Sequence, residues 1–453
     1  MKFLEKIECW LFYALVFFVP LQLRIILRSF SSQFNEWTST YLYATDILIF
    51  LILLFWLTRK IKEKKWKIVS FQNIWVEVGL FLFLLVSGVS IFLSNNFWLS
   101  FFSWVKLVEF SLLFLYIKYN FGKLFSLQRF WQIFMVSAVV QSGLAIYQFF
   151  AQKSLGLKIL AESPIAPDIL GVAKIVVDGK KIVRAYGLVP HPNILAAILM
   201  LAIFGLIYLF IKNYGKLKNW QKAVYGGTLI LVSVALFFTF SRSATLIGFI
   251  LFAIWLAVVY WKQAACRRPI ILTAILLLAI CSLLLAIYRP YVSARYDTVS
   301  LGASQAVSLR VFYSEIAWQL IKGSPILGVG QGNFVWTFIQ PAALEDWIYQ
   351  PVHNIYLLIA AETGILGLFA FLWFLFKITR SIYLEKKAIK DRLSLYCLFS
   401  IFIFFLAIGF FDHFLWDLQQ GQLMLWMGLG IIAGLSPYGS LLRPNGFGLR
   451  KGK

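Results

Sequence analysis

Hydrophobic residues occur along this chain in long blocks that are separated by short polar segments. Many blocks hold about 18 to 25 residues, enough for a helix that rises ~1.5 Å per residue to cross a ~30 Å hydrocarbon layer. The blocks lack the regular apolar and polar alternation of a membrane β-strand. We therefore expect an all-α polytopic membrane protein with about twelve transmembrane helices.

The expected helices form one transmembrane domain, residues 1–453, with two long segments between them. The predicted spans are residues 7–27, 42–58, 73–94, 97–117, 130–151, 192–211, 223–240, 243–261, 270–288, 354–376, 393–411 and 421–437. The long segments are residues 152–191 and 289–352. The first span has no small-residue cleavage site after it, so we predict a retained helix and no signal peptide.

Composition supports a membrane protein, and the charge pattern sets its orientation. The 453 residues are 61% hydrophobic and 13% charged, whereas soluble domains average about 45–50% apolar. The net charge is +23, and most Lys and Arg gather in alternate short loops, as cytoplasmic loops do. Both termini, including a basic tail at 438–453, are thus expected in the cytoplasm, and both long segments outside it.

The same distribution argues against two other kinds of site. Nucleic-acid binding needs a continuous basic face, which short scattered loops do not provide. The four cysteines fall in helices or on the expected cytoplasmic side, so no disulfide or thiolate metal site is predicted.

The larger outer segment is predicted to contain an amphipathic helix near residues 308–322. Ser308 is a cap signal, and Phe312, Ile316 and Leu320 lie on one helical face. Gly323 ends the pattern. We expect this helix to lie over the membrane core.

The stretch Pro351-Val-His353-Asn354 places one of three histidines at the outer start of a span. Pro351 favours an extended approach, and Asn354 is a plausible helix cap. The helix dipole at this end disfavours a protonated ring. A neutral imidazole can accept a proton, so His353 is our candidate general base.

His191 and His413 are placed at the same outer surface by the predicted topology. A histidine at such a position is commonly a polar helix cap. For these two residues, a role as a helix cap and a role in the site both stay open.

Three arginines are expected on the same face. Arg242 is the charged break in the long apolar run 223–261, which we predict folds as a tight hairpin. Arg310 begins the amphipathic helix, and Arg184 precedes the sixth span. Such arginines often reach toward lipid phosphates, but a set of guanidiniums beside His353 suits a pyrophosphate, which they bind bidentately.

Other polar features give weaker signals. The stretch 328–333, GVGQGN, lacks the Lys-Ser/Thr of a phosphate-binding loop and is predicted to be a turn. Glu345 and Asp346 have no clear third ligand, which disfavours a divalent metal, and whether they bind one stays open. Glu362 lies ~13 Å along the helix from His353, which favours a packing or gating role.

Several segments, in this order, resemble the O-antigen ligase and polymerase superfamily. They are FSRSA (240–244), SLRVFYSEIAWQLIKGSPILGVGQGNF (308–334) and PVHNIYLLIAAETGILG (351–367). The stretches RAYGLVPHPNILA (184–196) and FDHFLWDLQQG (411–421) are also similar to segments of that family.

The resemblance implies a GT-C glycosyltransferase that takes a glycan from polyprenyl (undecaprenyl) pyrophosphate at the extracytoplasmic face of the bacterial inner membrane. By this resemblance His353 activates the acceptor hydroxyl, and Arg242, Arg310 and, in a more variable motif, Arg184 engage the pyrophosphate. It also implies inversion at the anomeric carbon, without a metal or cofactor. The remaining candidate site residues are His191, Asn354, His413, Asp412 and Glu362.

The acceptor and the partners stay open at this stage. The acceptor is a glycan, a lipid such as lipid A core, or a protein, in which case the chain is a protein O-oligosaccharyltransferase. A chain-length regulator is a further candidate partner. A lipid-linked sugar transporter or flippase is the alternative class, but its usual internal repeat is not seen.

Overall fold

The computed structural model describes residues 2–63, 74–296, 301–339, 344–386, 389 and 391–435. The expected basic tail at 438–453 lies outside these residues, as does the side chain of Asp346. Within them the protein is mostly helical, and two small sheets are present.

The longer helices are α1 (Lys2–Phe18), α2 (Ala44–Glu63), α3 (Trp75–Ser90), α4 (Phe97–Asn120), α5 (Leu127–Ala151), α6 (Pro192–Asn213), α7 (Asn219–Phe238), α8 (Arg242–Lys262), α9 (Arg267–Ile287), α11 (Leu301–Gly323), α13 (Ile355–Glu385), α14 (Arg392–Ile408) and α16 (Gln419–Gly434). Three helices are short: α10 (Arg289–Tyr296), α12 (Phe334–Ile339) and α15 (Phe414–Asp417).

Helices occupy all twelve predicted spans, but the count of twelve membrane crossings is not confirmed. Among the described residues, eight helices are long and apolar enough to cross a membrane: those at Trp75–Leu93, Phe97–Asn120, Leu127–Ala151, Pro192–Lys216, Asn219–Phe238, Arg242–Lys262, Ala264–Ile287 and Ile355–Leu384. Helices α1, α14 and α16 have 16 or 17 residues. The chain is therefore a multi-pass membrane protein.

Two antiparallel hairpins correct the expectation of an all-α protein. Strands β1 (Arg24–Ser29) and β2 (Ser39–Tyr43) pair with each other, as do β3 (Lys174–Val177) and β4 (Lys180–Val183). The predicted first span, 7–27, was wrong at its end, because α1 stops at Phe18 and β1 follows. Arg24 holds the first hairpin by an ion pair to Glu36 and by packing 4.1 Å above the Tyr41 ring.

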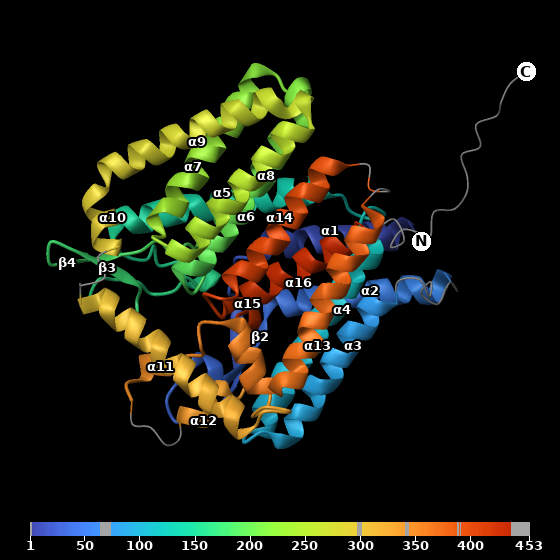
Figure 1. The fold of residues 1–453 in the computed structure, drawn as a ribbon, viewed down its shortest axis with the longest axis vertical. Coiled ribbons are helices and arrows are strands. Elements are labelled where there is room, and N and C mark those ends of the chain that lie inside the picture. Colours follow the sequence, from blue (N-terminus) through green and yellow to red (C-terminus); the bar gives the residue numbers. More distant parts are fainter. Residues whose placement is uncertain are drawn as a thin grey trace, which may run out of the picture.

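Helix α6 is the central helix of the bundle, and it is apolar on all sides, as a fully surrounded helix should be. It packs against α5, α7, α8 and α14. Figure 1 shows α7 to α10 on one side of α6, and α2 to α4 with α11 to α13 on the other. The first turn of α6 therefore lies between these two parts.

Helix α13 is broken at Gly364, which has φ 70° and ψ −178°. The loop before α12 fills the break: Ile365 N donates to Pro325 O (2.9 Å), and Gly330 N donates to Glu362 O (2.9 Å). Irregular backbone at membrane depth is tolerated when its polar groups are bonded within the protein. The break is thus a packed joint.

The predicted turn at GVGQGN is confirmed and belongs to this joint. Gly328, Gly330 and Gly332 all have positive φ. A Cβ on Gly330 would overlap Ser94, and one on Gly332 would overlap Ser103. The glycines allow the loop to pack closely against the turn between α3 and α4.

We predict that Gly364→Ala lowers thermal stability in detergent. The new Cβ would overlap the Ile326 carbonyl oxygen in a positive-φ conformation, a strain of about 1–3 kcal/mol before the overlap is added. The midpoint of thermal unfolding measures the effect. Gly143→Ala in α5 is the control, since its Cβ would meet nothing within 4 Å; equal midpoints for the two variants would contradict the joint.

Candidate active site

His353 lies directly before α13, where the sequence predicted it. Asn354 caps the helix as expected, because its Oδ1 accepts hydrogen bonds from Tyr356 N (2.9 Å) and Leu357 N (3.1 Å). Ile355 N donates to Gly409 O (2.8 Å), which joins this end of α13 to the end of α14. The His353 side chain is 21% exposed and is therefore accessible to a substrate.

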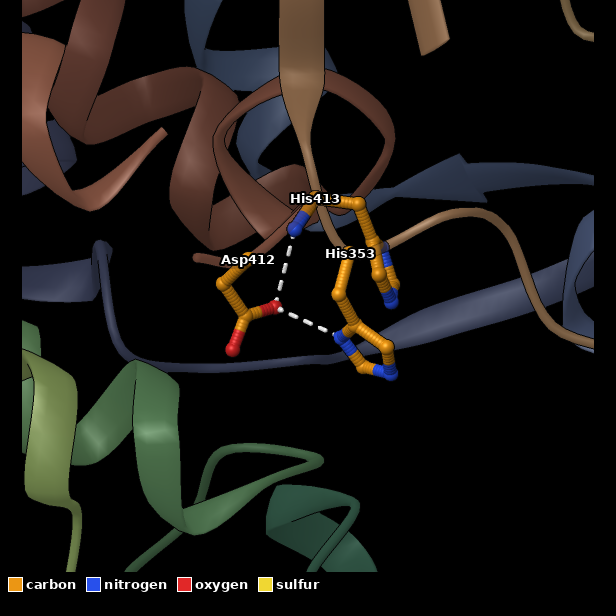
Figure 2. Close-up of side chains that lie close together, drawn as sticks. All are labelled: His353, Asp412 and His413. Carbon is orange, nitrogen blue, oxygen red and sulfur yellow. Dashed lines mark hydrogen bonds and ion pairs between the residues drawn. The ribbon is translucent and has the colours of Figure 1, made fainter. Parts of the chain in front are cut away.

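Asp412 follows α14 and faces His353 (Figure 2). Its Oδ1 is 3.6 Å from His353 Nδ1, too long for a hydrogen bond in this state. The carboxylate is otherwise fixed, since Oδ1 accepts from His413 N (2.9 Å) and Oδ2 from Asn193 Nδ2 (2.7 Å). Asp412 is buried, so the pair has the composition of a histidine base with its orienting carboxylate.

Arg184 links this carboxylate to the turn between α7 and α8. The buried guanidinium donates through Nε to Thr239 O (2.6 Å) and through Nη2 to Asn193 Oδ1 (2.8 Å). Asn193 lies in the first turn of α6, and its Nδ2 donates in turn to Asp412 Oδ2. Arg184 thus has its hydrogen bonds within the protein.

Arg295 holds the same turn from α10. Its Nε donates to Phe240 O (3.0 Å), and Phe240 has a left-handed φ of 45°, a conformation that costs about 1 kcal/mol or more for a non-glycine residue. Arg242 follows two residues later as the first residue of α8. The predicted hairpin tip at Arg242 is confirmed.

The charges of these arginines affect the pKa values of neighbouring arginines and of the histidines. Burial and the charges of Arg242 and Arg310 lower the pKa of Arg295 to about 10. Burial and the charges of Arg295 and Arg242 also lower the pKa of Arg184. Clustered guanidiniums without matching carboxylates attract an anion, because the anion relieves their repulsion.

The pKa of His353 is lowered from its ordinary value. Burial is the main cause and the charge of Arg310 adds to it, while Asp412 opposes both. Arg310 lies on α11, which packs against α13. The ring is therefore neutral at pH 7, as a general base must be before it accepts a proton.

The other two histidines lie in the same group but in different states. His191 caps α6, its Nδ1 accepts from Asn193 N (3.2 Å), and burial with the Arg184 charge lowers its pKa to about 3. His413 is 4.9 Å from His353 between ring centroids. Burial disfavours its charged form, but Asp417, 2.8 Å from Nδ1, raises the pKa of His413 overall.

Glu362 does not reach His353. Its Oε2 accepts from Trp416 Nε1 (3.0 Å), and its carboxylate also accepts from the backbone at Gly332 and Phe334. These bonds fasten the loop before α12 to α13, which agrees with a packing role.

His353, Asp412 and His413 have ligand atoms within 4.8 Å of one another, a spacing that a metal ion could use. The positive charge of Arg310 reaches both histidines and opposes a cation there. This charge and the pairing of His413 with Asp417 disfavour a metal ion, although the donor types themselves are suitable.

An apolar groove of about 250 Å³ begins at the same turn. It runs between α7, α8, α9 and α10, and we call it the α7–α10 groove. Arg242 and Arg295 stand at one end with Ser241, and Phe249, Leu284 and Leu285 line the rest. Ser241 is buried, and its Oγ has no partner among the described residues. A groove with this polarity fits a lipid that carries an anionic head.

Sequence reasoning missed Arg295, Asn193 and Asp417. Arg295 satisfies the criterion applied to the other arginines, since it follows a predicted span on the expected outer face. Asn193 carries no local signal, because its partner Asp412 is 219 residues away. Asp417 does carry one, since it follows His413 at the i,i+4 spacing of a helical pair.

The helices and this group of side chains define a multi-pass membrane protein with a histidine–carboxylate pair and clustered arginines at one end of its bundle. Residues 227–372 match a family model described as O-antigen ligase. The match confirms the resemblance to the O-antigen ligase superfamily and implies a membrane glycosyltransferase of the ligase or polymerase kind. It spans Arg242, Arg295, Arg310 and His353. No curated protein matches the chain.

We predict that Asp412→Asn moves the acid limb of the pH profile of kcat/KM to lower pH. Asp412 raises the pKa of His353, so removing its charge lowers that pKa further. The plateau should also fall about 10²-fold, as when an orienting or proton-transfer group is lost. Asp391→Asn is the control, since Asp391 caps α14 at the end away from this site; an unmoved limb in Asp412→Asn would contradict the pairing.

Proposed function

We propose that this protein transfers a glycan from a polyprenyl pyrophosphate to an acceptor hydroxyl at the outer face of the bacterial inner membrane. The convergence of His353, Asp412 and the arginines at one end of the helices carries this proposal. The O-antigen ligase match supports the reaction class.

The donor is held by its two chemically distinct parts. The isoprenoid chain lies in the α7–α10 groove, whose lining is apolar. The pyrophosphate lies at the start of α8, where the helix dipole, the free Ser241 hydroxyl and the guanidiniums of Arg242 and Arg295 favour an anion. Arg310, on α11, adds a further positive charge that offsets the negative charge of the pyrophosphate.

The transfer step needs one base and one leaving group. His353 takes the proton of the acceptor hydroxyl, and the oxygen forms a bond to the anomeric carbon. The bond from that carbon to the pyrophosphate breaks, and the pyrophosphate leaves with the electron pair. Attack opposite to the leaving group inverts the carbon.

The surrounding residues stabilise the charges that this step creates. Asp412 stabilises the imidazolium of His353, and the arginines stabilise the departing pyrophosphate. Arg184 acts through Asn193, which ties the donor turn to Asp412. No acid is needed on the leaving group, because a pyrophosphate leaves readily.

A lipid-linked sugar transporter would use the same arginines to bind the pyrophosphate. The broken helix α13 is a feature that transporters share. Here the backbone groups at Gly364 are bonded to the loop at 325–330, so the break offers no free groups to a substrate. A fixed base beside the anion site favours transfer.

The purified protein with a lipid-linked oligosaccharide and candidate acceptors tests the proposal. We expect glycan transfer by the wild type and a loss of about 10²- to 10⁴-fold in kcat for His353→Ala. Lipid A core, lengthened lipid-linked glycan or glycosylated peptide as product identifies the acceptor class. Passage of intact donor across vesicles without transfer would contradict an enzyme.

We predict that Arg295→Gln raises the KM for the lipid-linked donor about tenfold, because a charged contact to the pyrophosphate is lost. Arg289→Gln is the matched control on the same helix, since Arg289 is exposed and does not line the α7–α10 groove. Titrations of the lipid-linked donor measure the KM of both variants. Equal KM values for the two variants would exclude Arg295 from the donor site.

A further inference from the structure

A second cavity, of about 100 Å³, lies on the other side of the histidines from the α7–α10 groove. Its walls come from β2, the loop at 331–335 and the ends of α4 and α16 nearest the site. In Figure 1, β2 and α12 lie on the α11 to α13 side of the molecule, away from α7 to α10. We call it the Trp37 cavity, after the aromatic residue whose ring lies edge-on to that of His413.

The lining of the Trp37 cavity combines aromatic rings, carboxylates and amides. Trp37, Tyr41 and Trp416 supply rings, Glu36 and Asp417 supply carboxylates, and Gln331 supplies an amide. No arginine lines it, and its lysine, Lys106, is bound to Asp46 (2.6 Å) and Glu109 (2.9 Å). This chemistry disfavours a phosphate.

Two polar groups of the cavity have no partner among the described residues: Gln331 Oε1 and Trp37 Nε1. Gln331 is 4% exposed, so solvent does not replace the missing bond at its surface. An unpaired buried acceptor costs about 1–3 kcal/mol. Gln331 Oε1 needs a hydrogen-bond donor, and Trp37 Nε1 needs an acceptor. A hydroxyl group can serve as either.

The cavity leads toward the base. The Trp37 ring lies 5.7 Å from the His413 ring, which lies 4.9 Å from that of His353. Pro351, two residues before His353, also lines the cavity. A molecule held here extends toward His353 from the side away from Arg242 and Arg295 of the α7–α10 groove. Arg24 borders the cavity, but it is paired with Glu36.

We infer that the Trp37 cavity binds one sugar ring of the acceptor and presents the next hydroxyl to His353. This inference rests on the proposed function and adds to it that the acceptor is a carbohydrate. Sugar C–H faces pack on aromatic rings, and sugar hydroxyls bond carboxylates and amides. At about 10–15 Å³ per water, the volume holds roughly seven or more waters, close to one monosaccharide.

The position also meets the stereochemical demand of the reaction. Inversion requires the hydroxyl to approach the anomeric carbon from the face opposite the pyrophosphate. With the pyrophosphate at the arginines, that face is turned toward His413 and the cavity. The donor and the acceptor thus enter on opposite sides of His353.

Sugar binding is measured directly by saturation-transfer NMR with methyl glycosides of glucose, galactose and N-acetylglucosamine. Wild-type protein in detergent should saturate at least one glycoside. Trp37→Phe and Gln331→Leu should weaken the signal, since each removes one unpaired group and keeps most of the side-chain volume. Trp56→Phe is the matched control, because Trp56 Nε1 is also unpaired and Trp56 does not line the cavity.

Transfer kinetics give the second readout. Trp37→Phe and Gln331→Leu should each raise the KM for the acceptor about 3- to 10-fold, the size of one hydrogen bond, and leave the KM for the lipid-linked donor unchanged. Thermal midpoints equal to that of Trp56→Phe show that both variants are folded.

Three results would overturn the inference: no glycoside saturation by the wild type, equal saturation in all variants, or transfer to a Ser/Thr peptide in preference to every sugar. Saturation that is lost in both variants, from a protein that transfers no glycan, would support the sugar site and contradict the proposed function instead. The two ideas can therefore fail separately.

Discussion

The site depends on one buried hydrogen-bonded connection, from Thr239 through Arg184 and Asn193 to Asp412. It joins the turn that carries Arg242 to the turn that faces His353, across the first turn of the central helix α6. Each buried member has a partner, which a buried guanidinium and carboxylate require. The connection therefore fixes Asp412, which faces His353, relative to the turn that carries Arg242.

The electrostatics on the two sides of this connection are opposite in character. On one side, burial and the charges of neighbouring guanidiniums lower the pKa of Arg184 and of Arg295. On the other, the Trp37 cavity is lined by carboxylates and amides, and its lysine is already paired. His353 stands between them in a neutral state. By our proposal, this separation directs an anionic lipid and a polyhydroxy acceptor to different entrances.

The sequence predicted the helices, because long apolar blocks have few other stable forms in a bilayer. It also predicted the position of His353, the Asn354 cap and the Arg242 turn, since each follows from a local break in the apolar pattern. Pairings over long distances were not predictable: Asn193 with Asp412, or the loop at 325–330 inside α13. Those contacts depend on how α6, α13 and α14 pack. The hairpin β1–β2 was missed because its strand Arg24–Ser29 reads as a continuation of the first apolar block.

The central claim is that His353 and the arginines share one lipid pyrophosphate. A cryo-EM map of the His353→Ala protein with bound polyprenyl-pyrophosphate glycan tests it most directly. We expect pyrophosphate density within hydrogen-bonding distance of Arg242 and Arg310, the isoprenoid chain between α7 and α9, and the anomeric carbon facing residue 353. Density for the pyrophosphate at the opposite end of the helices, or remote from both arginines, would contradict the account.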